Sequence, residues 1–71
     1  MSDHHTYKKI EVVGSSRDSI DDAIRNAIKQ SAKSVNNLEW FEVVETRGHI
    51  VDGDIGHFQV VLKLGFKIES S

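Results

Sequence analysis

The sequence predicts an α+β fold in which one helix packs against a three-stranded antiparallel sheet. Apolar residues recur every three or four positions only between residues 20 and 35, which indicates one helix. The segments on either side of it alternate apolar and polar residues, as strands covered on one face do. The last two segments are joined by Val51-Asp52-Gly53-Asp54, which is typical of a tight turn. The order of elements is therefore strand, helix, strand, strand.

The first strand is expected over residues 7–13 and ends where Gly14-Ser15-Ser16 begins. Ser16 is the expected N-cap of a helix that begins near Arg17, because a serine hydroxyl can accept a backbone N–H of the first turn. Asp18, Asp21 and Asp22 place negative charge at the positive end of the helix dipole. The helix is expected to end at Asn36-Asn37, because asparagine tolerates the left-handed backbone of helix ends.

The helix and the last strand each carry one apolar face. On the helix the face consists of Ile20, Ile24, Ala27, Ile28, Ser31 and Val35. The second strand is expected over residues 38–50 and the third over residues 55–69, with Phe58, Val60, Leu62, Leu64, Phe66 and Ile68 on one side. The third strand is the most apolar, which predicts a central position and the strand order 1-3-2.

The other face of the sheet carries the most informative residue, Trp40, which the alternation turns away from Phe41 and Val43. A turn centred near Gly53 predicts four cross-strand pairs: Trp40 with Gly65, Glu42 with Lys63, Val44 with Val61, and Thr46 with Gln59. Glu42 and Lys63 are expected to form a charge pair. Gly65 is expected to leave room beside the indole for a flat body. An exposed indole indicates either an aromatic ligand or a subunit contact.

The two ends of this open face carry different polar groups. Trp40 lies at one end with Lys67 nearby, and Gln59 lies at the other end near Arg47. The ends are about 20 Å apart at the rise of a β-strand, so one small ligand cannot touch Trp40 and Gln59 of the same chain. A site that uses both residues must therefore lie between subunits.

Size and charge restrict the class of protein. The 71 residues are interpreted as one domain, residues 1–71, of which residues 1–5 are expected to be loose. So short a chain without cysteine buries little apolar surface, and this predicts a homo-oligomer. The net charge of −2, without a basic run, argues against nucleic acid as a partner. No apolar segment is long enough to cross a membrane, and the first residues lack a signal-peptide core, so the expected location is the cytoplasm.

The sequence indicates neither a catalytic site nor a metal site. Ser15, Ser16 and Ser19 have no evident histidine partner, and the glutamates of the second strand point to alternate faces, so no enzyme is predicted. The four histidines, His4, His5, His49 and His57, lack the spacing of a metal site, and none is predicted. Gly14-Ser15-Ser16 lacks the glycine pattern of a phosphate loop, which favours a capping role.

Several motifs together resemble the dodecin family: Leu38-Glu39-Trp40-Phe41-Glu42-Val43, Arg47-Gly48-His49, His57-Phe58-Gln59-Val60 and Gly65-Phe66-Lys67-Ile68-Glu69, preceded by Val13-Gly14-Ser15-Ser16. The resemblance implies a hollow dodecamer in which flavins lie as stacked pairs between subunits. It implies that Trp40 stacks on the flavin ring and that Gln59 bonds its pyrimidine edge.

The same resemblance implies the ligand class. Bacterial dodecins are associated with FMN, and some also with coenzyme A, which makes Arg47 and Lys67 the candidates for a phosphate. Many relatives carry arginine at the position of Lys67. Lysine lacks the two-pronged geometry of arginine, so the preference for FMN over riboflavin is expected to be looser.

The resulting hypothesis is a non-catalytic homododecamer that stores FMN or riboflavin and shields it from photochemistry. Two alternatives stay open. One is a coenzyme A-binding module, and the other is a structural or adaptor oligomer in which Trp40 is an interface hot spot.

Overall fold

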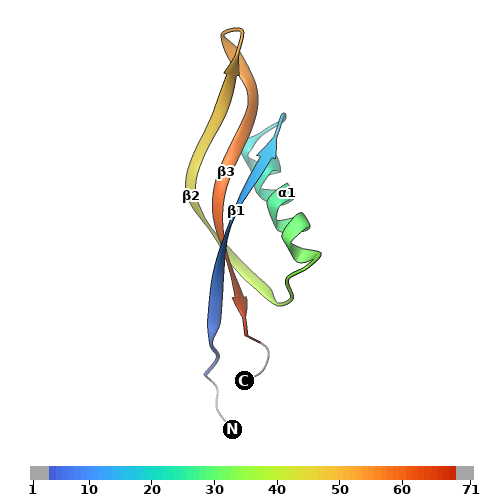
Figure 1. Cartoon of the computed structure of the whole chain (residues 1–71), viewed down its shortest axis with the longest axis vertical. Helices are drawn as coiled ribbons and strands as arrows, with labels where there is room; N and C mark the ends of the chain where they lie inside the picture. The colour runs from blue at the N-terminus through green and yellow to red at the C-terminus, as the bar shows by residue number, and fades with distance from the viewer. Residues whose placement is uncertain (1–3, 69–71) are drawn as a thin grey trace.

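The computed structural model describes residues 4–68, which form one helix and one sheet (Figure 1). The elements are β1 (Tyr7–Ser16), α1 (Ile20–Ala32), β2 (Leu38–Val51) and β3 (Asp54–Lys67). The strand order is β1-β3-β2 and both pairings are antiparallel, which confirms the predicted fold class and strand order. The third strand was predicted to run through Ile68 to Glu69, but β3 ends at Lys67, so this prediction is wrong at Ile68, and Glu69 lies outside the described residues.

The helix begins later than predicted, at Ile20, and its N-cap is Ser19, whose Oγ accepts the Asp22 N–H at 3.0 Å. The prediction of Ser16 as cap and Arg17 as first residue is wrong. Ser16 is still in β1, where it pairs with Phe58. Its hydroxyl closes the following turn, accepting the N–H of Asp18 at 2.9 Å and donating to the Asp22 carboxylate at 2.7 Å.

The helix also ends earlier than predicted, at Ala32 rather than at Asn36-Asn37. Lys33 is the C-cap, and its N–H bonds to the carbonyls of Gln30 and Ser31. Asn37 does adopt the left-handed backbone expected of it, with φ 66°, but it uses this conformation to enter β2.

The core lies between α1 and the central strand. It consists of Ala23, Ala27, Val60, Leu62 and Leu64, all nearly or fully buried. The helix also sits closely on β1, because Gly14 has no side chain. A Cβ at Gly14 would lie 2.8 Å from the Cβ of Ala27 and closer still to the carbonyl oxygen of Ala23. Gly14 therefore allows the helix to pack closely on β1. The strand continues through Gly14 to Ser16, so the prediction that it ends at Gly14 is wrong.

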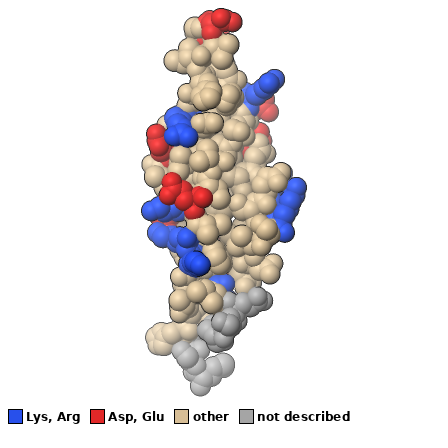
Figure 2. Space-filling view, in the orientation of Figure 1, with Lys and Arg blue, Asp and Glu red and all other residues tan. Residues whose placement is uncertain are grey.

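Strand β2 is left largely uncovered by the helix, which packs on β1 and β3 (Figure 1). Phe41 and Val43 point to the helix side of the sheet, yet they remain 47% and 46% exposed. At the far end of the β2–β3 hairpin, Ile50 is 81% exposed. Charged side chains of both signs are scattered over the face in Figure 2, separated by wide uncharged areas. An isolated protomer thus exposes apolar surface that association of subunits would bury.

The predicted hairpin register is correct near Trp40, but the observed register shifts further along the two strands. Trp40 pairs with Gly65 and Glu42 with Lys63, as predicted. A bulge at Val44 then inserts one residue, so Glu45 faces Val61 and Arg47 faces Gln59. The predicted pairs of Val44 with Val61 and of Thr46 with Gln59 are therefore wrong.

Candidate functional site

The Trp40 indole lies against the sheet, directly over Gly65. A Cβ built on Gly65 would lie 2.5 Å from Cδ2 of the indole, and Cε2 and Cζ2 would be closer still. These three atoms are joined within the ring system, so a point this close to all of them lies over the face of the ring. The room that Gly65 was expected to leave for a ligand is thus filled by the indole itself.

The opposite side of the indole remains accessible. Trp40 is 38% exposed, although one face of its ring is covered by the sheet. Tyr7 of β1 packs near the same ring, with centroids 5.4 Å apart and planes inclined by 68°. The site therefore presents one ring face, with a fixed underside, to a flat partner.

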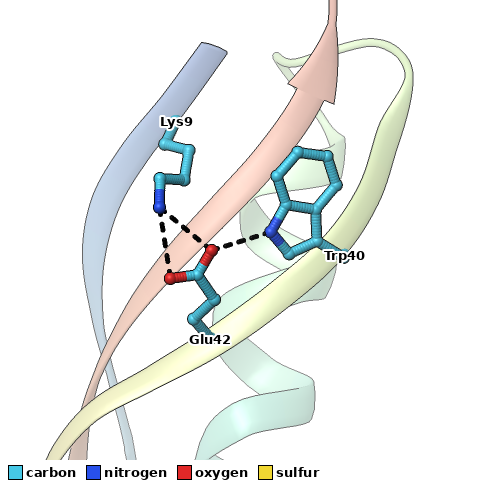
Figure 3. A network of polar contacts seen from close by, with 3 residues as sticks. All are labelled: Lys9, Trp40 and Glu42. Atoms are coloured by element: carbon cyan, nitrogen blue, oxygen red, sulfur yellow. Dashed lines mark hydrogen bonds and ion pairs between the residues drawn. The ribbon is translucent and has the colours of Figure 1, made fainter. Parts of the chain in front are cut away.

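The indole nitrogen is anchored by a neighbouring carboxylate (Figure 3). Trp40 Nε1 donates to Glu42 Oε2 at 2.9 Å, and Lys9 Nζ donates to both oxygens of Glu42 at 3.0 and 3.2 Å. Glu42 thus forms its ion pair with Lys9 of β1, rather than with its register partner Lys63 as predicted. Because Gly65 carries no side chain, Lys9 can reach across the central strand.

These contacts favour the ionised form of Glu42. The hydrogen bond from Trp40 lowers the pKa of this carboxyl group most, followed by the hydrogen bond from Lys9, and the positive charges of Lys9 and Lys63 act in the same direction. Glu42 is therefore a carboxylate at neutral pH, and the bond that it accepts from the indole is charge-assisted.

The other predicted residues lie at the far end of the open face. Arg47 Nε donates to Gln59 Oε1 at 3.0 Å, which confirms that these two side chains are neighbours. Arg47 also approaches Glu45 at 3.8 Å. In the part of the chain that the structure describes, the Gln59 amide nitrogen has no partner, so it is available to donate to a ligand.

Lys67 lies near the Trp40 end, opposite Tyr7 in the register of β1 and β3. Its backbone N–H donates to the Asn37 carbonyl at 3.2 Å, which holds the end of β3 against the loop before β2. The structure thus places Trp40 and Lys67 at one end of the face and Gln59 and Arg47 at the other. Gly65 lies six positions after Gln59 along β3, which is about 20 Å at the rise of a strand.

A small hollow next to Trp40 lies on the helix side of the sheet, since it is lined by Ile28 of α1 and the core residue Leu64, together with Leu38, Glu39, Trp40 and Phe41. It measures about 150 Å³, whereas sites for small molecules usually span roughly 300–1,000 Å³. On the open face the indole is a partly exposed surface group, so a flavin stacked on it would need further walls from a second subunit.

Sequence reasoning missed two residues of this site, Lys9 and Tyr7. The available signal was the alternation of β1, in which Ile10 and Val12 face the core and Tyr7 and Lys9 therefore point to the open face. The structure then places Lys9 opposite Gly65 and Tyr7 opposite Lys67, beside Trp40.

The histidines offer two imidazoles at the hairpin end of the open face. The rings of His49 and His57 lie 4.4 Å apart, centroid to centroid, and are tilted by 51°. Among residues 4–68 no group of three or more potential metal ligands occurs. The histidine pair therefore lacks the additional protein ligands of a closed site.

The dodecin family model matches residues 6–69 of this chain. The chain belongs to the dodecin family. A dodecin of Thermus thermophilus is 42% identical over 65 residues, which cover 92% of this chain and 94% of that protein. The dodecin of Streptomyces coelicolor has a similar structure, with a TM-score of 0.93 and 48% identity over 99% of this chain and 100% of its own. For the dodecin of Streptomyces davaonensis the TM-score is 0.90 and the identity 47%, covering 93% and 97% of the two chains.

Family membership implies that the protein assembles from several subunits, in agreement with the apolar surface that the protomer exposes. Within residues 4–68, the single helix is too short and too polar to cross a membrane.

Proposed function

We propose that this protein is a non-catalytic flavin carrier, a cytoplasmic homododecamer that stores FMN or riboflavin between its subunits. The observation that carries the proposal is the indole of Trp40, which is seated on Gly65 with its outer face accessible. A ring held in this way stacks on a flat heterocycle without losing further freedom of its own, and this favours binding.

The polar residues match the remaining parts of a flavin. The free amide nitrogen of Gln59 can donate to a carbonyl oxygen of the pyrimidine edge, while Arg47 holds the amide oxygen and so fixes its orientation. Arg47 and Lys67 supply positive charge for the phosphate of FMN. Because Trp40 and Gln59 lie too far apart on one chain, the stacking residue and the bonding residue would come from different subunits.

Stacking on tryptophan also accounts for a protective role. An excited flavin ring accepts one electron from the indole and returns it, so that both partners recover their ground states. This cycle quenches fluorescence and removes the excited state before it can react. The stored flavin would thereby be shielded from light.

The test is a fluorescence titration of FMN with ligand-free protein, combined with light scattering to measure the mass of the particle. Deep quenching that saturates on a particle of about twelve chains supports the proposal. Trp40→Ala should weaken binding by about 1–3 kcal/mol, the usual contribution of stacking on an aromatic ring, which is roughly 5- to 150-fold in Kd. Trp40→Phe serves as the conservative control and should lose less.

Two results would contradict this function. Unchanged affinity in Trp40→Ala would rule out stacking on this residue. A well-folded oligomer that leaves FMN fluorescence unquenched would favour the alternatives, and titration with coenzyme A would then distinguish a coenzyme A-binding module from an adaptor that binds another protein through Trp40.

A further inference from the structure

Three side chains from the two outer strands meet above the central strand. Lys9 of β1 and Trp40 of β2 are both register partners of Gly65, and Glu42 lies in the next row of the same face. Because Gly65 has no side chain, Lys9 crosses β3 and the indole occupies the space above it. The result is a continuous contact from β1 to Trp40 through one carboxylate (Figure 3).

We propose that Glu42, held in place by Lys9, is the positioning residue that fixes the plane of the Trp40 indole for stacking on a flat ligand. The inference rests on the function proposed above and assigns to Glu42 and Lys9 a part in it. Neither residue needs to touch the ligand, because both act through the indole.

The need for such a residue follows from the freedom of the tryptophan side chain. Rotation between Cβ and the ring is only weakly restricted, so an exposed indole can present different edges and faces. Gly65 supports the ring from below but offers no polar group that selects one orientation. The acceptor at 2.9 Å from Nε1 supplies that selection, since turning the ring over would leave the N–H without Glu42.

Lys9 in turn limits the freedom of Glu42. Its ammonium group contacts both carboxylate oxygens, at 3.0 and 3.2 Å, although both side chains are nearly half exposed. An exposed ion pair alone contributes little to stability. Here the ion pair keeps one carboxylate oxygen of Glu42 directed at the indole N–H. Its removal should therefore change the affinity for the ligand more than the free energy of unfolding.

The charged groups that face Glu42 are Lys9 and Glu11 on β1 and Lys63 on β3, and the two lysines favour its ionised form. Together with the indole N–H, the two lysines lower the pKa of the carboxyl group. The contact is therefore expected to persist at neutral and mildly acidic pH, and to fail when the carboxylate is protonated.

The experiment compares Glu42→Gln and Glu42→Ala with wild type in the FMN titration, after light scattering has shown the same oligomer. Glutamine keeps the shape and one acceptor but not the charge, so we expect Kd to rise roughly three- to tenfold, and further for alanine. Lys9→Gln should produce a smaller loss. The matched control is Glu11→Gln, which changes a charge in the same row without touching Trp40 and should leave Kd unchanged.

A second readout does not depend on the ligand. The chain contains a single tryptophan, so the indole N–H gives one NMR signal. In the ligand-free oligomer this proton should exchange with solvent faster in Glu42→Gln than in wild type, and the Glu11→Gln control should not change it.

The outcomes separate this inference from the function on which it rests. If wild type binds FMN and Glu42→Gln binds it equally well, the positioning role is overturned while the flavin function stands. An equal loss in Glu11→Gln would also overturn it, because general charge rather than the contact would then be responsible. If wild type fails to bind FMN, both proposals fall together.

Discussion

Gly65→Ala is the smallest change that should disturb the candidate site. The added Cβ would lie 2.5 Å from Cδ2 of Trp40 and closer to two further ring atoms. Carbon atoms in contact are separated by about 3.5–4.0 Å, so the indole must move by at least about 1 Å. A movement of this size also lengthens the 2.9 Å hydrogen bond to Glu42, because Nε1 moves with the ring.

The expected effect is the loss of most of the stacking contribution. Stacking on an aromatic ring is worth about 1–3 kcal/mol, so Kd for FMN should rise roughly 5- to 150-fold in Gly65→Ala. The assay is quenching of FMN fluorescence, with the mass of the oligomer measured on the same samples. The loss should occur although alanine suits a strand better than glycine does.

A double-mutant cycle shows whether the clash is the cause. In a Trp40→Ala background the added methyl group meets no ring, so Gly65→Ala should have almost no further effect on Kd. The reasoning is refuted if Gly65→Ala binds FMN like wild type, or if its penalty is equally large when the indole is absent.

Three further predictions concern the helix, the hairpin and pH. Gly14→Ala places a Cβ against the backbone of α1 and should lower the free energy of unfolding by about 1–3 kcal/mol, measured by thermal denaturation at a fixed protein concentration. Ile50→Asp changes a side chain that is 81% exposed in the protomer. If assembly covers Ile50, the buried charge should give a smaller particle in light scattering. An unchanged particle would show that Ile50 stays exposed in the oligomer. The stabilising contact of Glu42 is present above the pKa of the unfolded chain and is lost as the pH falls through the lower pKa of the folded chain. Lys9→Gln removes one cause of that lowering, so the pH-dependent change in tryptophan fluorescence should begin at a higher pH than in wild type.

Much of the fold could be predicted from the pattern of apolar and polar residues in the sequence. The alternation of β3 predicted its central place, and the turn at Gly53 predicted that Trp40 faces Gly65. The start of the helix was misplaced because Ser16 and Ser19 are both suitable N-cap residues. Ser16 is kept in the sheet by its pairing with Phe58, a tertiary contact that local sequence does not reveal.

The positions of the candidate residues on the sheet were predicted, whereas several of their contacts were not. Trp40, Gln59, Arg47 and Lys67 all lie where the open face was expected, and Arg47 does contact Gln59. The predicted ion-pair partner of Glu42, Lys63, was wrong because register describes only which backbone positions lie opposite each other. A long lysine side chain, such as that of Lys9, can pass over a glycine and reach the strand beyond it. The bulge at Val44 was also missed, although two adjacent valines, Val43 and Val44, interrupt the alternation of apolar and polar residues at this point.

That bulge changes which residue numbers share a face of β2. Before it, the even-numbered Trp40 and Glu42 point to the open face, and after it the odd-numbered Glu45 and Arg47 do. A regular strand with the same number of residues would turn Arg47 toward the opposite side of the sheet from Trp40. The one extra residue of the bulge thus keeps the cation at one end of the open face on the same side of the sheet as the indole at the other end, although the side chain of Val44 takes no part in either.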